Sequence, residues 1–201
     1  MAAKRRAETM EENRAKLIAA ARKSFAERGF AAASMDELTA SVGLTRGALY
    51  HNFGDKKGLL AAVVAQVDGE MAQRAKAAAA NAGDDWERLL AEGIAYIKMA
   101  LDAEVRRIVL LDGPAFLGDP THWPSQNSCQ ESTSQSVIKM IERGELKPMD
   151  ADAAAHLLNG AALNAALWIA ASDDPQQALP KVIEVFTLLA SGLRCNDNKV
   201  K

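Results

Sequence analysis

The segment from residue 34 to 53 constrains the fold of this chain most. Ser34 is followed three positions later by Glu37, the S-x-x-E pattern in which the hydroxyl and the carboxylate each satisfy a free N–H group at a helix start. Gly43 then ends that helix, and Thr45 caps the next one. Two short helices joined by a glycine-containing turn predict a helix-turn-helix.

The rest of the chain is also predicted to be helical. Apolar residues recur at three- and four-residue spacing, alanine is common and β-branched runs are short. Hydrophobic residues make up 49% of the chain and charged residues 25%, which is typical of a globular protein. Helices are expected over residues 11–27, 35–42, 46–53, 56–80, 84–101, 103–112, 124–144, 150–172 and 175–194.

These helices predict two domains. Residues 1–57 form a three-helix head, a long helix over about 56–80 that starts at Lys56 leads out of it, and residues 81–201 form a helical body. The head carries eleven Lys or Arg against seven Asp or Glu, whereas the rest carries thirteen against nineteen. A basic head on an acidic body fits a protein that contacts phosphates at one end.

The predicted helix-turn-helix has a buried side and an exposed side. The residues expected to pack the two helices onto the first helix are Leu38, Val42, Leu44, Leu49 and Phe53, against Leu17, Ala21 and Phe25. The residues left together on the outside are Thr45, Arg46, Gly47, Ala48, Tyr50 and His51. Small, hydroxyl, aromatic and basic groups in this arrangement suit the major groove of DNA. A helix-turn-helix that serves packing alone is the alternative.

The run from Leu17 to Leu60 resembles the N-terminal domain of the TetR family. The resemblance lies in A-A-x-x-x-F-A-E-R-G-F, then S-M-D-E-L-T-A-S-V-G-L, then T-R-G-A-L-Y-H-N-F-G-D-K-K-G-L-L. It implies a homodimeric, ligand-responsive transcriptional repressor that binds a palindromic DNA operator. In such a protein a small molecule bound in the C-terminal body releases the DNA.

The resemblance also implies the DNA contacts. They are expected at Ser34, Thr45, Arg46, Gly47, Ala48, Tyr50, His51 and Lys56. Tyr50 and Lys56 match phosphate-contacting positions of the family, and Asn52 stands where the family often has histidine. The basic residues at 4–6 are either an arm that adds phosphate contacts or a solvated tail.

The last two expected helices are predicted to form the dimer interface. One carries Ala153, Leu157, Ala161, Asn164 and Trp168 near one face, and the other carries Val182, Val185, Phe186, Leu189 and Leu193. Small residues allow helices to cross closely, so four such helices from two chains form a bundle. Packing of both stripes inside one subunit is the alternative.

An unidentified small-molecule effector is expected in the body. Aromatic and methionine surface with a few amides is the usual lining of such a site. The candidate residues are Tyr96, Met99, Ala103, Leu110, Phe116, Trp123, Asn127, Gln130, Asn159, Leu163 and Trp168. Asn159 and Asn164 stand out because an amide on an apolar helix face needs a partner, which is either the effector or the second subunit.

Other function classes are disfavoured by the sequence. It has no glycine-rich phosphate loop, no G-x-S-x-G elbow and no clustered His, Cys and Asp set, so no enzyme is predicted. Neither a cofactor nor a metal site is expected, because the three histidines are scattered. Without a secretory signal or an uninterrupted apolar span, we expect a cytoplasmic protein that does not enter a membrane. A regulator without effector, an activator and an effector-free architectural DNA binder are the alternatives.

Overall fold

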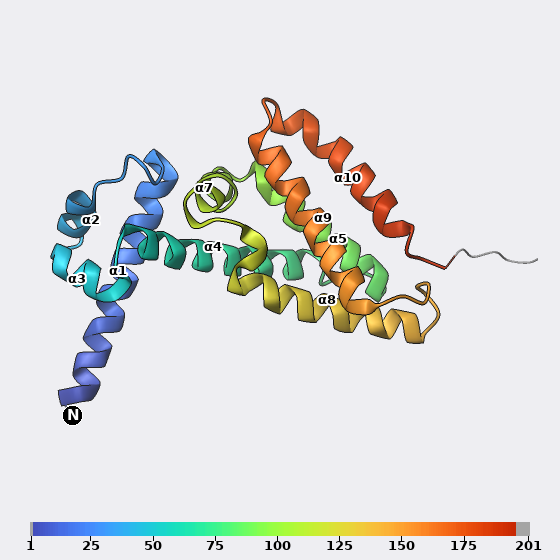
Figure 1. The fold of residues 1–201 in the computed structure, drawn as a ribbon, viewed down its shortest axis with the longest axis horizontal. Helices are drawn as coiled ribbons and strands as arrows, with labels where there is room; N and C mark the ends of the chain where they lie inside the picture. Colours follow the sequence, from blue (N-terminus) through green and yellow to red (C-terminus); the bar gives the residue numbers. More distant parts are fainter. Residues whose placement is uncertain (1, 196–201) are drawn as a thin grey trace, which may run out of the picture. The chain divides into compact units, whose positions relative to one another are not determined.

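The computed structural model describes residues 2–195 of the chain, and the side chains of residues 8–124 and 128–195. In this part of the chain every regular element is a helix, which confirms the predicted all-α fold (Figure 1). The α-helices are α1 (Ala2–Arg28), α2 (Met35–Ser41), α3 (Arg46–Phe53), α4 (Lys56–Ala78), α5 (Asp85–Lys98), α6 (Ala103–Val105), α7 (Gly113–Leu117), α8 (Pro124–Glu142), α9 (Ala151–Ala171) and α10 (Pro175–Ser191). Short 3-10 helices are η1 (Met99–Leu101) and η3 (Pro120–His122), and η2 (Arg106–Asp112) is a π-helix.

The chain forms two compact units. The head unit comprises the residues up to Asp68 together with Ala103–Pro120, and the body unit comprises Gly69–Asp102 and the residues from Thr121 onward. The predicted ranges assigned residues 103–120 to the body. The structure instead groups them with the head unit, because they are bonded to the end of α1.

Local hydrogen bonds define the helix starts in the head unit. The side chains of Ser34, Thr45 and Asp55 each accept a bond from the backbone N–H three residues further on, at 3.4, 3.2 and 2.7 Å. These caps satisfy donors that have no partner within the helix. Gly43 and Gly54 follow α2 and α3 with φ of 67° and 76°, a region that residues with a Cβ rarely adopt. The predicted turn therefore forms as expected.

The capping box of α2 differs from the prediction. Ser34 accepts from the Glu37 N–H as expected, but the Glu37 carboxylate accepts from the Arg28 guanidinium at 2.6 Å. A hydrogen bond between two charged groups is stronger than one to a neutral backbone N–H, so the ion pair takes the place of the reciprocal half of the box. It links the end of α1 to the start of α2.

The core of the head unit lies where the sequence predicts it. Leu17 and Phe25 of α1 and Leu49 of α3 are fully buried, and Leu38 of α2 is nearly so. Phe53 is half-buried and lies beneath the Arg14 guanidinium, which is 4.7 Å from the ring centroid. This arrangement fixes α3 on α1 through one side, and it leaves the opposite side of α3 open.

A buried carboxylate ties η2 to the end of α1. Asp112, only 8% exposed, accepts a hydrogen bond of 2.7 Å from the backbone N–H of Phe30. Arg107 lies 3.3 Å from the same carboxylate oxygen, and its guanidinium covers Gly29, where an added Cβ would fall 1.8 Å from Nη2. The glycine thus allows an arginine to lie directly on the backbone.

Two further contacts join the same parts of the head unit. Phe30 packs against Phe116 of α7, with ring centroids 4.5 Å apart. Arg22 of α1 forms a two-pronged ion pair with Glu104 of α6, both bonds being 2.7 Å. Bidentate pairs of this kind fix geometry as well as adding stability. Residues 103–120 are therefore attached to α1 along about two turns of that helix.

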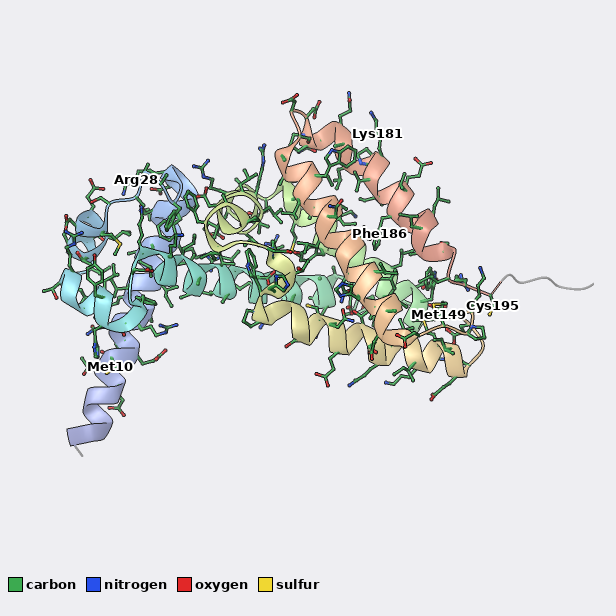
Figure 2. The ribbon with its side chains drawn as sticks, viewed as in Figure 1. Met10, Arg28, Met149, Lys181, Phe186 and Cys195 are labelled. Carbon is green, nitrogen blue, oxygen red and sulfur yellow. The ribbon has the colours of Figure 1, made fainter. Side chains whose placement is uncertain are left out.

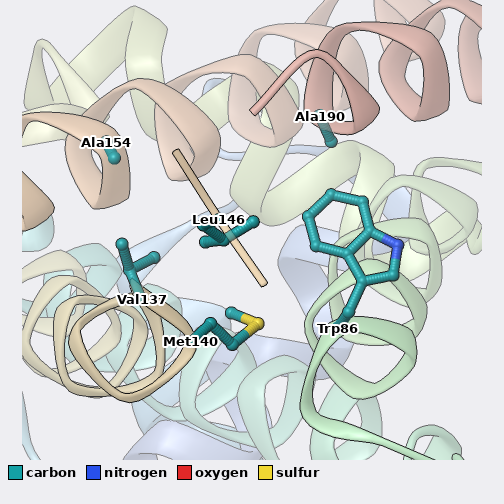
Figure 3. Packing of buried hydrophobic residues seen from close by; sticks show 6 residues of the cluster. All are labelled: Trp86, Val137, Met140, Leu146, Ala154 and Ala190. Carbon is teal, nitrogen blue, oxygen red and sulfur yellow. The ribbon is translucent and has the colours of Figure 1, made fainter. Parts of the chain in front are cut away.

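The body unit has an apolar core between α5, α8, α9 and α10. Its central cluster contains Trp86, Val137, Met140, Leu146, Ala154 and Ala190 (Figure 3). The Phe186 ring of α10, labelled in Figure 2, comes so close to α5 that a Cβ on Gly93 would lie 2.8 Å from it. The glycine in α5 therefore allows close packing of these two helices.

One described helix, α9, is long and apolar enough to cross a membrane by length and composition. Half of its apolar window is buried inside the structure, and six of its alanines are buried in the body unit.

Candidate nucleic-acid interface and effector site

The recognition helix α3 has one buried side and one exposed side. Leu49 is fully buried against the core of the head unit, whereas the next residue, Tyr50, is half exposed. Of the predicted contacts on this helix and its cap, Thr45, Arg46, Gly47, Tyr50 and His51 are exposed and Ala48 is half-buried. The structure therefore brings together the set that the sequence predicted. Small, hydroxyl, aromatic and basic groups exposed in this way suit the major groove of DNA.

Arg46 begins the recognition helix and pairs with α2. Its Nε lies 3.2 Å from the Asp36 carboxylate, and both side chains are more than half exposed. An exposed ion pair of this kind contributes little to stability. The guanidinium can therefore exchange Asp36 for a guanine edge or a phosphate at small cost.

Asn52 lies on the inner side of the recognition helix. Its side-chain amide donates to the Ala48 backbone carbonyl at 2.7 Å, and the backbone carbonyl of Asn52 accepts from the Arg14 guanidinium at 3.4 Å. Asn52, which stands where the family often has histidine, thus forms its hydrogen bonds within the head unit.

Lys56 forms contacts that the sequence did not indicate. Its ammonium donates to the carbonyls of Phe30 and Ala31 and lies 4.5 Å from the centroid of the Phe30 ring. Partial burial removes water from the ammonium and lowers the pKa of Lys56. A phosphate contact by Lys56 stays a prediction, and the structure adds a role in holding the loop after α1.

Ser34 is half-buried, and its hydroxyl is used in capping α2. A phosphate contact by this residue also stays a prediction. The predicted basic arm, Lys4, Arg5 and Arg6, has side chains that lie outside the described residues.

The junction of α3 and α4 depends on two residues that the sequence reasoning did not single out. Asp55 caps α4 through the Gly58 N–H, and Gly58 lies against the end of α3. A Cβ on Gly58 would lie 1.9 Å from the backbone oxygen of Phe53. The sequence signal was the second glycine of the G-D-K-K-G run, because a glycine inside a helix lowers its stability and can mark close packing.

The candidate effector residues do not all lie in one unit. Met99 and Leu163 are buried in the body unit, and Tyr96, Trp123, Gln130 and Asn159 are half-buried there. Ala103, Leu110 and Phe116 belong to the head unit instead. Trp168 is 61% exposed, so within a single chain it lies on the surface. The Asn127 side chain lies outside the described residues.

Two of the candidates carry buried polar atoms without a partner. They are the indole nitrogen of Trp123 and the amide nitrogen of Asn159. The Asn159 carbonyl oxygen accepts from the Thr133 hydroxyl at 3.1 Å. Gln130 is bonded differently, since its amide donates to the Asp152 carbonyl at 2.8 Å. Trp123 and Asn159 thus differ from the other described candidate effector residues in having a buried N–H group without a partner.

An apolar face on α9 and α10 is open to solvent in the single chain. We call it the α9/α10 face, and its large members, each 56–71% exposed, are Leu157, Trp168, Val185, Leu188 and Leu189. The predicted stripe on α10 was wrong in part, because Val182 and Phe186 are buried inside their own subunit and Leu193, just beyond the end of α10, packs against the core cluster. Apolar residues surround much of α10, so the pattern could not separate its two sides. Leu188 takes their place on the exposed side.

Comparisons with known proteins agree with this geometry over both units. Residues 17–63 match the family described as bacterial regulatory proteins, tetR family. Residues 86–193 match the tetracyclin repressor-like C-terminal domain. The first match covers the helix-turn-helix, and the second covers more than half of the chain.

Similar proteins match this chain over most of its length. A TetR-family transcriptional regulator from Pectobacterium atrosepticum is 48% identical, covers 93% of this chain and 96% of its own, and superposes with a TM-score of 0.84. The HTH-type transcriptional regulator TtgR of Pseudomonas putida is 27% identical over 76% of this chain and 77% of its own. RolR in complex with resorcinol shares the fold, at 20% identity and a TM-score of 0.68, over 92% of this chain and 96% of its own. The chain belongs to the TetR family of transcriptional regulators.

Proposed function

We propose that this chain is a homodimeric repressor that binds a palindromic operator and leaves it when a small molecule binds the body unit. The observation that carries the proposal is the exposed side of α3, where Thr45, Arg46, Gly47, Tyr50 and His51 lie together above a buried Leu49. A helix with its polar residues outward and its first residues exposed is the arrangement that reads base edges.

The proposed dimer rests on the α9/α10 face. Five large apolar side chains on two helices that pack together are open to solvent, and large apolar surfaces of this kind mark protein–protein interfaces. A second copy of the same face covers it with two-fold symmetry. Such a dimer carries two recognition helices, which suits two half-sites about one helical turn of DNA apart.

The proposed release mechanism is a shift in population. α4 contributes Lys56–Asp68 to the head unit and its remaining residues to the body unit, so it is a long helix that both units share. A ligand that binds better to a conformation with the wrong half-site spacing lowers the affinity for operator. A regulator without effector and an activator are the alternatives. The proposed location is the cytoplasm, where the DNA is.

Footprinting on the DNA around the chain's own gene tests the function. We expect protection of one palindrome. The protein concentration that gives half-maximal protection should change little when nonspecific competitor DNA is added. Uniform coverage would instead indicate an architectural DNA binder, which needs more positive charge than the acidic body offers. Transcription from the protected promoter then separates a repressor from an activator. Native mass spectrometry of freshly purified dimer looks for a retained small molecule.

Arg46→Ala is expected to weaken operator binding by about 1–3 kcal/mol and to relax the base preference at one position. The reason is that Arg46 begins the exposed side of α3 and is held only by a surface ion pair. Competition between operators that differ at single base pairs measures both effects. Normal affinity of Arg46→Ala for the operator would show that α3 does not read it.

Lys56→Ala is the comparison variant. It is expected to weaken binding to all sequences alike, since a phosphate contact carries no base information. Its melting temperature should also fall, because the bonds to the Phe30 and Ala31 carbonyls are lost.

Leu189→Arg is expected to weaken dimerisation about tenfold to a hundredfold, because a charge then has to be buried in the α9/α10 face. Leu189 is 65% exposed in the single chain, so folding of the subunit should be unaffected. The control is Ile138→Arg, at an exposed apolar residue of α8. Sedimentation over a range of concentrations measures the dimer dissociation constant. Equal constants for the two variants would contradict the assigned interface.

A further inference from the structure

Phe30, the second residue after α1, is held by several parts of the head unit at once. Its backbone N–H donates to the Asp112 carboxylate of η2 at 2.7 Å, and its carbonyl accepts from the Lys56 ammonium of α4. Its ring lies 5.6 Å from the ring of Phe25 in α1 and 4.5 Å from that of Phe116 in α7, between centroids. The position of Phe30, and of the carbonyl that Lys56 binds, is therefore determined in part by residues of η2 and α7.

The groups that bind Lys56 are neutral. Its ammonium donates to the carbonyls of Phe30 and Ala31 and lies over the Phe30 ring, and within the described residues it forms no ion pair. Arg22 and Arg28 of the same unit differ in this respect, because each pairs with a carboxylate. Lys56 is thus held in place without losing its net positive charge to a neighbour.

The way in which Lys56 is held suits a contact with a phosphate. A lysine ammonium has three N–H donors, and the carbonyls of Phe30 and Ala31 use two of them. A lysine that is free on a surface loses much of its rotamer freedom when it binds a phosphate. For Lys56 that loss occurs already on folding, so less of it opposes binding.

We propose that Asp112 and Phe30 are positioning residues for binding to the DNA backbone. Asp112 holds the Phe30 N–H, and the Phe30 carbonyl in turn holds the Lys56 ammonium with one donor left for a phosphate. The inference rests on the proposed function, in which Lys56 contacts a phosphate. It goes beyond that function because it gives a residue of η2 an effect on the strength of the backbone contact.

The salt dependence of binding to a mixed-sequence DNA duplex tests the proposal on the full-length protein. The slope of the logarithm of the binding constant against the logarithm of the salt concentration reports the number of phosphates contacted. Lys56→Ala is expected to lower the magnitude of this slope by about 1 for each subunit bound. Asp112→Ala is expected to cause most of the same loss, although Lys56 itself is unchanged.

Asp112→Asn is the charge-matched control for Asp112→Ala. Both variants remove one negative charge, but the amide oxygen of asparagine still accepts from the Phe30 N–H. The slope of Asp112→Asn should therefore stay close to that of the unsubstituted protein. In the double variant of Lys56→Ala and Asp112→Ala the slope should equal that of Lys56→Ala alone, because both changes remove the same contact.

Two further variants separate this effect from a general loosening of the head unit. Glu104→Ala breaks the two-pronged ion pair with Arg22, which joins the same segment to α1 without touching Phe30, and it should keep the slope. Phe116→Leu loosens Phe30 through its ring and should lower the slope in the same direction as Asp112→Ala. It provides the decisive comparison if Asp112→Ala does not fold. Circular dichroism at the temperature of the binding measurements shows that each variant is folded.

Four results would overturn the inference. They are an unchanged slope in the folded variants among Asp112→Ala and Phe116→Leu, an equal loss in Asp112→Asn, an equal loss in Glu104→Ala, and additive losses in the double variant. Preference of the unsubstituted protein for its operator over the mixed-sequence duplex is measured alongside. If that preference is present and the slopes fail, only the positioning role is wrong, whereas its absence contradicts the proposed function itself.

Discussion

Gly58→Ala is expected to abolish operator binding and to destabilise the head unit by more than about 3 kcal/mol. The added Cβ would lie 1.9 Å from the backbone oxygen of Phe53, and real Cβ atoms essentially never lie within 3.0 Å of such an atom. The obstacle is backbone, so it cannot rotate away, and overpacking of this kind exceeds the usual cost of about 1–3 kcal/mol. The end of α3 must move away from α4, and the recognition surface moves with it.

Gly69→Ala is the matched control, because it lies in the same helix and its Cβ would meet nothing within 4 Å. There the substitution should stabilise α4 by up to about 1 kcal/mol through helix propensity. Thermal unfolding followed by circular dichroism and operator binding by gel shift measure the pair. Similar behaviour of the two variants would mean that the α3–α4 junction is not as tight as described.

Asp112→Ala is expected to cost about 3 kcal/mol of stability. The substitution leaves the Phe30 N–H buried without an acceptor and removes the carboxylate that faces Arg107. Loss of one partner of a buried charged hydrogen bond costs more than the bond contributed, because the other group stays desolvated. For a chain of this size the melting temperature should fall by roughly 6–12 °C. Asp112→Asn should recover part of the loss, since its amide oxygen still accepts.

Asp102→Ala provides the surface comparison. Its carboxylate pairs with Arg74 at 3.1 Å, and an exposed pair contributes at most about 1 kcal/mol. If Asp102→Ala and Asp112→Ala lower the melting temperature equally, the contact between η2 and α1 is not a main support of the head unit.

The helix-turn-helix could be predicted because its signals are local. Ser34 and Thr45 cap within three residues, and Gly43 adopts the positive φ that ends α2. The buried positions followed from helical spacing, since Leu17, Leu38 and Leu49 each fall on the apolar side of their helix. Backbone geometry and periodicity are properties of short segments, and a single sequence contains them.

The contact between residues 103–120 and α1 could not be predicted in this way. Asp112 and Phe30 are 82 positions apart, and an aspartate next to a glycine is also typical of an ordinary loop. The expected helix over 103–112 stops before Gly113-Pro114, and no helix is expected again until residue 124, but α7 begins at Gly113, because proline is well tolerated in the first turn of a helix. The partner of a buried charge depends on tertiary packing, which no local pattern contains.

The body unit was predicted less completely for a related reason. α9 and α10 are apolar over more than one side, so Val182 and Phe186 could equally face a partner or their own core. In the structure both are buried in their own subunit, and the Phe186 ring packs closely against Gly93 of α5. Trp123 and Asn159 were among eleven candidate effector residues, and only the burial of their nitrogen atoms separates them from the others.

The π-helix η2 determines which residue numbers can meet. A π-helical turn holds more residues than an α-helical one, so positions five apart, such as Arg107 and Asp112, come to nearly the same side. In an α-helix the same two positions would be about 140° apart. A TetR-type chain with one residue fewer in this segment would form an ordinary helical turn, and could not bring both charged groups to Gly29 and Phe30. The length of the η2 segment therefore indicates whether a relative has the same contact between this segment and the end of α1.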